Sequence, residues 1–383
     1  MTVRTVRACA AGLAAVAALA AASFTSPAAA ADDPGHRQTQ AAMDAAVKNG
    51  VPGVAGQVKD TYSIWAGASG VGNLKTGQPR SAFDRYRIGS TTKTFVATVL
   101  LQMEAEGKLS LDDTLDRWLP GVVQGNGNDG RKITVRQLLN HTSGVFSYTS
   151  DPDFLANGFT EKFLEHRYDT YTPAQLVGIA MRYQPLFAPG TGWSYSNTDY
   201  VLAGMVVEKV AGRPYEDEIV RRVITPLGLY ATSVPRTGTS LPVPSSRAYS
   251  KLSLQPKPEG PTYDVTELNP SEAGAAGAMI SSSDDLNRFY AALLGGRLLP
   301  AAQLKEMKTA IPVAGAPFSA YGLGLMRTDL PCGGSVWGHG GGIQGSVTQA
   351  VTTPDGKHSL AFNLNGDWAG DGQAVVTAEY CPK

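Results

Sequence analysis

The stretch RIGSTTKTF, residues 87–95, places a serine and a lysine three positions apart. Ser90 is the only serine in the chain with a lysine at this spacing. Residues three apart share one face of a helix, so the amine of Lys93 can take the hydroxyl proton of Ser90 and make it a nucleophile. An N-cap serine followed by an exposed lysine gives the same string, so the pair needs support from elsewhere in the chain.

The stretch GWSYSNTDY, residues 192–200, supplies a second pair of candidates on a loop before a helical segment. Tyr195 and Asn197 form the only Tyr-x-Asn among fifteen tyrosines. A phenol near a lysine ammonium can be driven toward phenolate and shuttle a proton, and the Asn197 amide can hold a substrate carbonyl. A packed tyrosine on a capped loop is the structural alternative.

A third candidate is VWGHGGGIQGS, residues 336–346. In lipases and esterases HGGG donates backbone N–H groups to an oxyanion hole, but it accompanies a Gly-x-Ser-x-Gly nucleophile that this chain lacks. We expect instead an edge strand on which His339 is a cationic or hydrogen-bonding residue. The glycines after it would let a substrate backbone approach, and a strand N–H would complete an oxyanion hole with the nucleophile's own N–H. A β-bulge carrying a structural histidine is the alternative.

The elements that position these residues follow from the hydrophobic pattern. Residues 91–106 form an almost wholly apolar segment, which predicts a buried central helix, and residues 53–74 predict a β-hairpin. Helical segments dominate roughly 110–270, and β-like stretches return after about 320. We therefore predict an α/β fold of the α+β sandwich type, with an antiparallel sheet built from both chain ends and flanked by helices. The sheet lobe would cover about 35–110 and 270–383, and an inserted, mostly helical lobe about 111–269, with the site in the cleft between them.

The first thirty residues have the layout of a secretory signal peptide: Arg4 and Arg7, a short apolar run, and a small-residue end. We expect cleavage after Ala30 or Ala31 and an exported protein without a stable membrane anchor. An N-terminal anchor is the alternative, although the apolar run is shorter than the ~20 residues that a span needs.

The 383 residues carry 33 basic and 33 acidic side chains without a basic cluster, which argues against nucleic-acid binding. Of three cysteines, Cys9 would leave with the signal peptide, so Cys332 and Cys381 are expected to form a disulfide in an oxidising compartment; the unpaired state is the alternative. No metal or cofactor is expected, because the thiols are few and no histidine cluster accompanies them.

Taken in order, Ser-x-x-Lys, Tyr-x-Asn and His-x-Gly resemble the boxes of the serine penicillin-recognising family, which includes DD-peptidases, class C β-lactamases, esterases and D-aminopeptidases. The flanking strings ITVRQLLNHTSG and GAMISSSDDLNRF extend the resemblance over nearly the whole mature chain. It is strongest toward secreted actinobacterial D-alanyl-D-alanine carboxypeptidases, including a cysteine pair placed like Cys332 and Cys381. The resemblance implies a β-lactamase-like catalytic domain over 31–383.

The resemblance also implies a role for each matching residue. Ser90 would be acylated, Lys93 would activate it, Tyr195 would relay protons, Asn197 would orient the substrate amide, His339 would replace the lysine of the third box, Gly341 would belong to the substrate-binding strand, and the N–H groups of Ser90 and Gly342 would form the oxyanion hole. Whether Lys93 or Tyr195 is the main base is left open. His141 of HTSG is expected to be structural.

The third box departs from the carboxypeptidase pattern. There the box carries hydroxyls, His-Thr-Gly-Thr, and an arginine lies shortly before the first cysteine, and these groups bind a terminal carboxylate. Here Gly340 and Gly342 replace the hydroxyl residues, and Met326 takes the arginine position. Arg327 is adjacent, but neighbouring residues of a strand point to opposite faces. Glu272 falls where a related carboxypeptidase has an aromatic residue, and there it would favour a substrate amine; a solvated loop glutamate is the alternative.

Three functions follow from these observations. The first is a D-alanyl-D-alanine carboxypeptidase-like hydrolase of peptidoglycan stem peptides, acylated by β-lactams. The second is a D-stereospecific aminopeptidase, endopeptidase or esterase with the same acylation machinery. The third is a catalytically silent penicillin-binding protein, against which the intact boxes argue. We expect a monomer.

Overall fold

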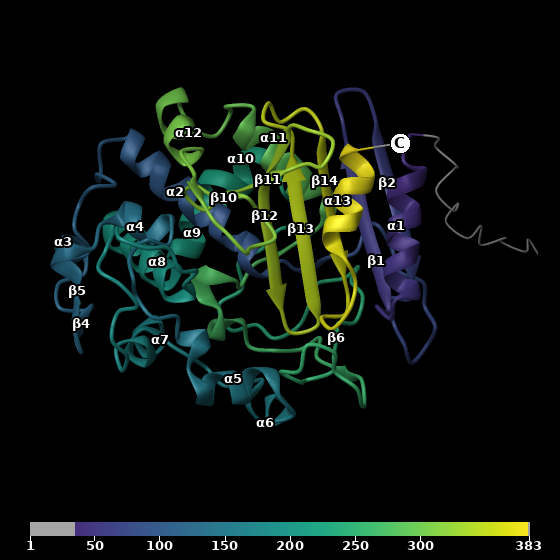
Figure 1. Cartoon of the computed structure of the whole chain (residues 1–383), viewed down its shortest axis with the longest axis horizontal. Helices are drawn as coiled ribbons and strands as arrows, with labels where there is room; N and C mark the ends of the chain where they lie inside the picture. The colour runs from purple at the N-terminus through teal and green to yellow at the C-terminus, as the bar shows by residue number, and fades with distance from the viewer. Residues whose placement is uncertain (1–34, 382–383) are drawn as a thin grey trace, which may run out of the picture. The chain divides into compact units, whose positions relative to one another are not determined.

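The computed structural model describes residues 35–381, and its central feature is an eight-stranded antiparallel sheet in the order β2-β1-β14-β13-β12-β11-β10-β9 (Figure 1). The predicted hairpin gives the first two strands, and the C-terminal third gives the other six. The strands are β1 (Gly53–Lys59), β2 (Ile64–Gly70), β9 (Ile311–Pro312), β10 (Ala320–Tyr321), β11 (Met326–Asp329), β12 (Ser335–Ile343), β13 (Ser346–Thr352) and β14 (Ser359–Leu364). The predicted sheet built from both chain ends is confirmed.

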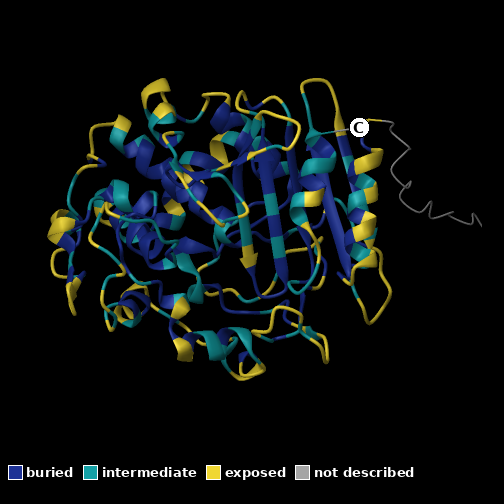
Figure 2. Cartoon of the chain, in the orientation of Figure 1, coloured by how far each residue is buried: buried dark blue, intermediate teal, exposed yellow. Residues whose placement is uncertain are grey.

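Helices cover both faces of this sheet, which explains why its central strands are buried along almost their whole length instead of alternating. Helices α1 (Arg37–Lys48) and α13 (Gly372–Tyr380), from opposite ends of the chain, lie side by side against one face (Figure 1). Helix α11 (Ser283–Leu294) contacts β1, β13 and β14 from the other face. Figure 2 shows the strands between these layers as buried.

The predicted central helix is α2 (Thr92–Ala105), and eleven of its fourteen residues are buried. It packs against α8 (Asn197–Ala211), and the two contribute to the largest hydrophobic core. Because apolar residues occur on all sides of α2, burial in the protein interior is the arrangement that keeps them from water. The first turn of α2 therefore has a fixed position relative to the sheet.

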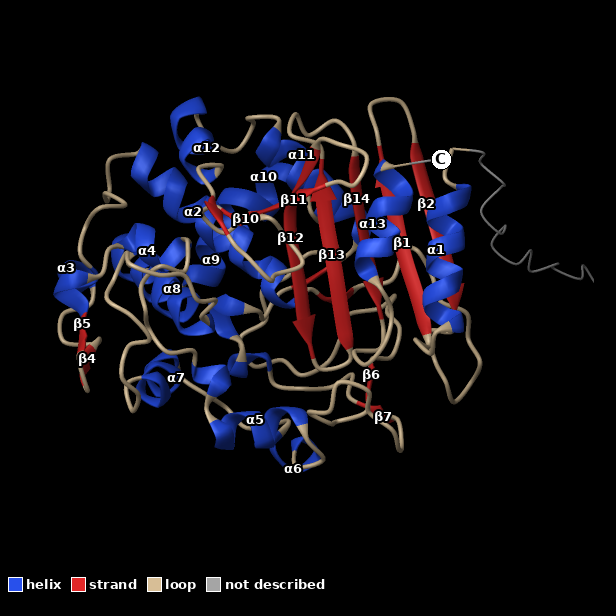
Figure 3. Ribbon diagram, viewed as in Figure 1, coloured by secondary structure: helices blue, strands red, loops and turns tan. Residues whose placement is uncertain are grey.

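Most of the remaining elements come between α2 and α11 in the sequence. They are helices and short strand pairs (Figure 3). The further helices are α3 (Leu115–Trp118), α4 (Val135–Leu139), α5 (Pro152–Phe159), α6 (Phe163–His166), α7 (Pro173–Ala180), α9 (Tyr215–Ile219), α10 (Thr225–Leu227) and α12 (Ala301–Met307). Short helical turns are η1 (Gly89–Thr91), η2 (Gly130–Lys132), η3 (Tyr148–Ser150), η4 (Val220–Ile224), η5 (Pro270–Glu272) and η6 (Gly274–Ala276). The paired short strands are β3 (Tyr86–Arg87) with β8 (Ile280–Ser281), β4 (Gln124–Gly125) with β5 (Asn128–Asp129), and β6 (Tyr249–Ser250) with β7 (Tyr263–Asp264).

The described residues form one compact unit, and the lobe boundaries predicted at 111 and 269 stay a prediction. Cys332 and Cys381 are disulfide-bonded, as expected, and the bond ties the turn between β11 and β12 to the end of α13. The predicted signal peptide lies outside the described residues. Within 35–381, no helix has the length and apolar character needed to cross a membrane.

Candidate active site

Ser90 lies in η1, which leads directly into α2, and this turn presses against β12. Gly89 has φ +50°, and a Cβ there would lie 2.8 Å from the backbone nitrogen of Gly342. Only glycine fits both the positive φ and this close approach. The sequence Gly89-Ser90 therefore holds the nucleophile against the third box of the sequence.

The amine of Lys93 is fully buried and reaches three oxygen atoms. Its Nζ lies 3.1 Å from Ser90 Oγ, 2.6 Å from Asn197 Oδ1 and 2.8 Å from the carbonyl oxygen of Ala276. Burial lowers the pKa of Lys93 well below its usual value, although the Asp199 carboxyl acts in the opposite direction. A neutral amine would donate its two hydrogens to Asn197 and Ala276, and its lone pair would face the Ser90 hydroxyl. This is the arrangement that a general base requires.

Tyr195 is the second candidate base, and its ring centre lies 4.8 Å from Lys93 Nζ. Burial raises the pKa of the Tyr195 phenol, and a hydrogen bond with Ser90 acts against that rise only in part. The phenol therefore stays protonated, contrary to the phenolate considered from the sequence, because desolvation penalises the anion. This geometry favours Lys93 as the base and Tyr195 as a proton relay.

Asn197 is the first residue of α8, and its side chain connects three elements. Its Oδ1 accepts from Lys93, its Nδ2 donates to Thr149 Oγ1 at 3.0 Å, and its backbone N–H donates to Ser147 Oγ at 3.0 Å. Besides lining a cavity beside Ser90, Asn197 thus holds the catalytic amine in place.

The structure changes the interpretation of His339. The second half of β12 pairs with β13 only, so this part is a free edge as predicted, but the histidine ring is completely buried. Its Nδ1 donates to the carbonyl oxygen of Gly340, and its Nε2 accepts from the Tyr321 hydroxyl at 2.9 Å. Burial, with the nearby Lys93, lowers the pKa of His339 to about 3. The ring is therefore neutral, and of the two expected roles, cationic or hydrogen-bonding, the structure favours the second. Because both nitrogens have protein partners, His339 positions β12 instead of contacting substrate.

Gly341 and Gly342 occupy β12 where it faces η1. A Cβ on Gly341 would collide with the carbonyl oxygen of Ile88 and lie 2.9 Å from the backbone nitrogen of Ser90, whereas a Cβ on Gly342 would meet nothing within 4 Å. Gly341 thus permits the close approach of β12 to η1, and Gly342 borders open space beside Ser90. The expected oxyanion donors, the N–H groups of Ser90 and Gly342, lie on these two facing segments.

We expect Gly341→Ala to lower kcat of amide hydrolysis by about 10²-fold, because the added methyl group must push β12 away from η1 and disrupt the oxyanion hole. Gly340→Ala is the matched control, since the one tight contact of a Cβ there is with the flexible end of the Gln349 side chain, and the nearest backbone atom is 3.8 Å away. Steady-state kinetics of both variants, with thermal unfolding as a folding check, would test this. Equal losses in the two variants would rule out a specific role for the approach at Gly341.

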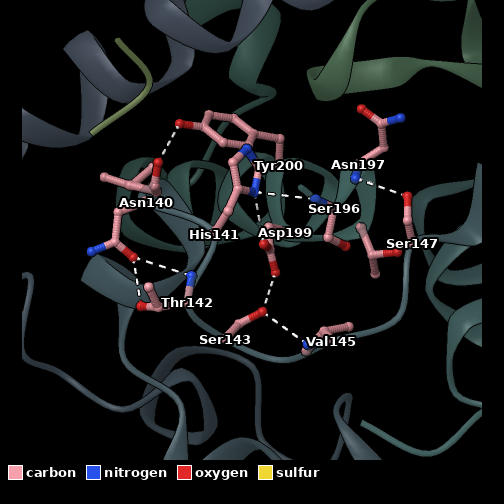
Figure 4. Close-up of polar contacts among 12 residues, drawn as sticks. Asn140, His141, Thr142, Ser143, Val145, Ser147, Ser196, Asn197, Asp199 and Tyr200 are labelled. Atoms are coloured by element: carbon pink, nitrogen blue, oxygen red, sulfur yellow. Dashed lines mark hydrogen bonds and ion pairs between the residues drawn. The ribbon is translucent and has the colours of Figure 1, made fainter. Parts of the chain in front are cut away.

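The HTSG segment forms a buried network behind the site (Figure 4). His141 has φ +62°, and its Nδ1 lies 2.9 Å from Asp199 Oδ2, while Ser143 Oγ donates to Asp199 Oδ1 at 2.6 Å. The His141 ring lies 4.4 Å from that of Tyr195. His141 is structural, as expected, and fixes α8 near Tyr195. Asp199 was not among the predicted residues. Its one signal in the sequence is that it is an acid in the first turn of an otherwise apolar helix.

Two cavities border Ser90 and share Gly342. The large cavity has a volume of about 740 Å³, and the small cavity about 60 Å³. Aromatic and apolar side chains that the sequence analysis did not single out line the large cavity, among them Trp193 and Phe318. No lysine, arginine or histidine appears among the described residues that line it.

Met326 and Arg327 confirm the strand argument. Met326 lines the large cavity, whereas Arg327 points away and pairs with Asp329 at 2.7 Å. The position expected for a carboxylate-binding arginine therefore presents a thioether. Among residues 35–381, no group of three or more His, Cys, Asp or Glu side chains is placed to hold a metal ion.

A half-buried Ser90 beside the buried amine of Lys93, next to an antiparallel sheet and backed by Tyr195 and Asn197, is the site of a serine hydrolase. The family model described as Beta-lactamase matches residues 36–375, so the chain belongs to the Beta-lactamase family.

Known proteins similar to this chain fall into two groups. A Bacillus subtilis (strain 168) penicillin-binding protein is 28% identical over 77% of this chain, which spans only 64% of that relative's length. Penicillin-binding protein 4 of Amycolatopsis lactamdurans is 28% identical over 86% of this chain and 85% of its own length. Among solved structures, a D-stereospecific amidohydrolase from Streptomyces sp. shares 57% identity and a TM-score of 0.86 over 91% of this chain and 99% of its own. D-amino acid amidase from Ochrobactrum anthropi SV3 shares 29% identity and a TM-score of 0.77 over 90% and 98%.

Proposed function

We propose that this protein hydrolyses the amide bond that follows a D-aminoacyl residue, through an acyl-enzyme on Ser90. The observation that carries the proposal is the large cavity, where Met326, Gly340 and Gly342 occupy positions that would hold an arginine and two hydroxyls in a carboxylate-binding carboxypeptidase. Without these groups, a free terminal carboxylate loses charge-assisted hydrogen bonds of about 1.5–3 kcal/mol each. A neutral amide or amine leaving group does not need them. The D-preference is supported by the two solved relatives, named as D-stereospecific amidohydrolase and D-amino acid amidase.

The chemistry follows from the contacts of Ser90. The neutral Lys93 amine takes the hydroxyl proton while Oγ attacks the amide carbon, and the N–H groups of Ser90 and Gly342 stabilise the resulting oxyanion. The C–N bond then breaks, and the Tyr195 hydroxyl relays a proton from the Lys93 ammonium to the departing nitrogen. Water attacks the ester in a second cycle, gives its proton to the same relay, and releases the carboxylic acid as Ser90 regains its hydrogen.

A panel of amides and peptides would test the proposal. We expect D-phenylalanine amide to be hydrolysed with a kcat/KM at least about 10-fold above that of diacyl-Lys-D-Ala-D-Ala, since a lost charge-assisted bond costs that much or more. L-phenylalanine amide is the stereochemical control, and a short-chain nitrophenyl ester reports acylation by an activated substrate. Faster release of D-alanine from the peptide would overturn the proposal in favour of the carboxypeptidase.

Two further properties belong to the proposal. Export is supported by the charged, apolar and small-residue order of the first thirty residues. Acylation of Ser90 by β-lactams is supported by membership of the Beta-lactamase family and by the penicillin-binding relatives.

A further inference from the structure

The small cavity beside Ser90 contains one carboxyl side chain. Ser90, Asn197 and Gly342 line this cavity together with Glu272, which lies at the end of η5. The rest of its wall is apolar or uncharged: Tyr148, Thr149, Phe154, Phe159, Ala273, Ala276, Gly277, Ile343 and Gln344. Glu272 is half-buried and lies in the wall of the site, so its carboxyl faces the cavity beside Ser90.

The backbone around Glu272 is held in place. Its carbonyl oxygen accepts from the buried Tyr148 hydroxyl at 2.7 Å. Four residues later, the carbonyl oxygen of Ala276 accepts from the catalytic amine of Lys93. The segment that carries Glu272 is thus tied at both ends to groups that border the nucleophile.

The Glu272 carboxyl has no cationic partner of its own in the described part of the chain. Among the described residues, no ion pair within 4 Å includes it. The nearby cation is Arg87, whose Nη2 donates to the carbonyl oxygens of Thr239 and Leu268 at 2.6 and 3.1 Å and whose charge acts on Glu272. Burial raises the pKa of Glu272 to about 7, while the Gln344 side chain and the charge of Arg87 counteract this only in part. A half-buried carboxylate without an ion-pair partner is costly, so a cation brought by a ligand into the cavity would be stabilised there.

We propose that Glu272 forms a subsite for the positively charged α-amino group of the substrate residue that acylates Ser90. This inference rests on the proposed function and narrows its substrates to D-amino acid amides and peptides with a free N-terminus. The small cavity has room for a few water molecules, which an amino group and its carbon can replace. In a substrate with an N-acyl group, the Glu272 carboxylate would face uncharged atoms instead of an ammonium group, so such a substrate should bind less well.

The test compares a pair of substrates that differ only in the amine: D-phenylalanine p-nitroanilide and its N-acetyl derivative. Wild-type protein should prefer the free amine by at least about 10-fold in kcat/KM, which is the effect of one charge-assisted bond. Glu272→Gln keeps the side-chain shape and removes the charge, so kcat/KM for the free amine should fall about 10- to 100-fold while that for the acetylated substrate changes little. Glu272→Asp should restore part of the preference.

Glu267→Gln is the matched control, because this acid lies in the same segment but lines neither cavity beside Ser90. The preference should survive in it. An unchanged preference in Glu272→Gln would overturn the inference. Equal losses on both substrates would overturn it as well, since they would mean that the carboxyl acts in the reaction itself or in folding.

A binding measurement separates this inference from the proposed function. We expect calorimetry to show that Ser90→Ala protein binds D-phenylalanine amide with an affinity at least about 10-fold higher than that of the Ser90→Ala, Glu272→Gln double variant. If wild-type protein hydrolyses neither nitroanilide, the proposed function fails, and the calorimetry alone decides the subsite. If hydrolysis proceeds but calorimetry shows equal affinities, the subsite fails and the proposed function stands.

Discussion

Replacing Lys93 with methionine is expected to lower kcat for D-amino acid amides by about 10³- to 10⁴-fold, the upper part of the range for a general base. The amine is the group that faces Ser90 Oγ with a lone pair, because Asn197 Oδ1 and the Ala276 carbonyl oxygen accept its hydrogens. Methionine has a similar length but neither a lone pair of that basicity nor hydrogens to donate. Single-turnover kinetics with an activated ester would show whether the loss lies in acylation.

The pH profile provides the second readout for Lys93. Because burial lowers its pKa well below the usual value, the neutral amine persists to a lower pH than in an exposed lysine, and acylation should be lost as the pH falls through that lowered value. Lys108→Met is the control, since this exposed lysine pairs with Glu106 at the surface. A Lys93→Met protein that acylates at the wild-type rate would show that another group is the base, and Tyr195 is then the candidate.

Local spacing predicted that Ser90, Lys93, Tyr195 and Asn197 come together. Ser90 and Lys93 are joined by one helical turn, and Asn197 begins the next long helix, so short-range geometry fixes most of their arrangement. The sheet followed from alternating and apolar runs near the two chain ends, and the disulfide from counting cysteines. These features depend on neighbouring residues or on the compartment, which a sequence displays directly.

Charge states at the site were not predictable in the same way. His339 is neutral because its ring is buried against Tyr321, eighteen residues earlier, and Tyr195 stays protonated because the elements packed around it desolvate its phenol. The pKa of a buried group depends on the complete set of atoms around it, which the third box alone does not specify. Glu272 reaches the site through loops whose course no periodicity reveals.

The two cavities give a physical reason for a preference between substrates. On the large-cavity side of Ser90, glycines and Met326 provide backbone and apolar surface and the one charged residue is the acid Asp371, whereas on the small-cavity side Glu272 provides a half-buried acid. A carboxypeptidase substrate carries its negative charge on the leaving group, and a free-amine substrate carries its positive charge on the acyl group. The distribution of polar groups around Ser90 matches the second kind of substrate.

Replacing Ser90 with alanine is expected to remove amide hydrolysis, with a loss of about 10⁴-fold or more in kcat, because no covalent intermediate can form. The same change should abolish covalent labelling by a fluorescent penicillin. Binding of D-phenylalanine amide should persist, since the walls of both cavities are unchanged. Intact-mass spectrometry after incubation with penicillin would detect the acyl-enzyme in wild-type protein and its absence in the variant.

Ser63→Ala is the control, because this exposed serine lies in the turn between β1 and β2, far along the sequence from the three boxes. It should retain both hydrolysis and labelling. A labelled Ser90→Ala protein would disprove the assignment of the nucleophile. Unlabelled wild-type protein that still hydrolyses D-amides would preserve Ser90 as nucleophile and remove β-lactam acylation from the proposal. In that case Ser90 is reactive, but the bicyclic ring of penicillin does not reach it, whereas a D-amide does. Comparing penicillin with the amide therefore distinguishes poor access to Ser90 from poor reactivity of Ser90.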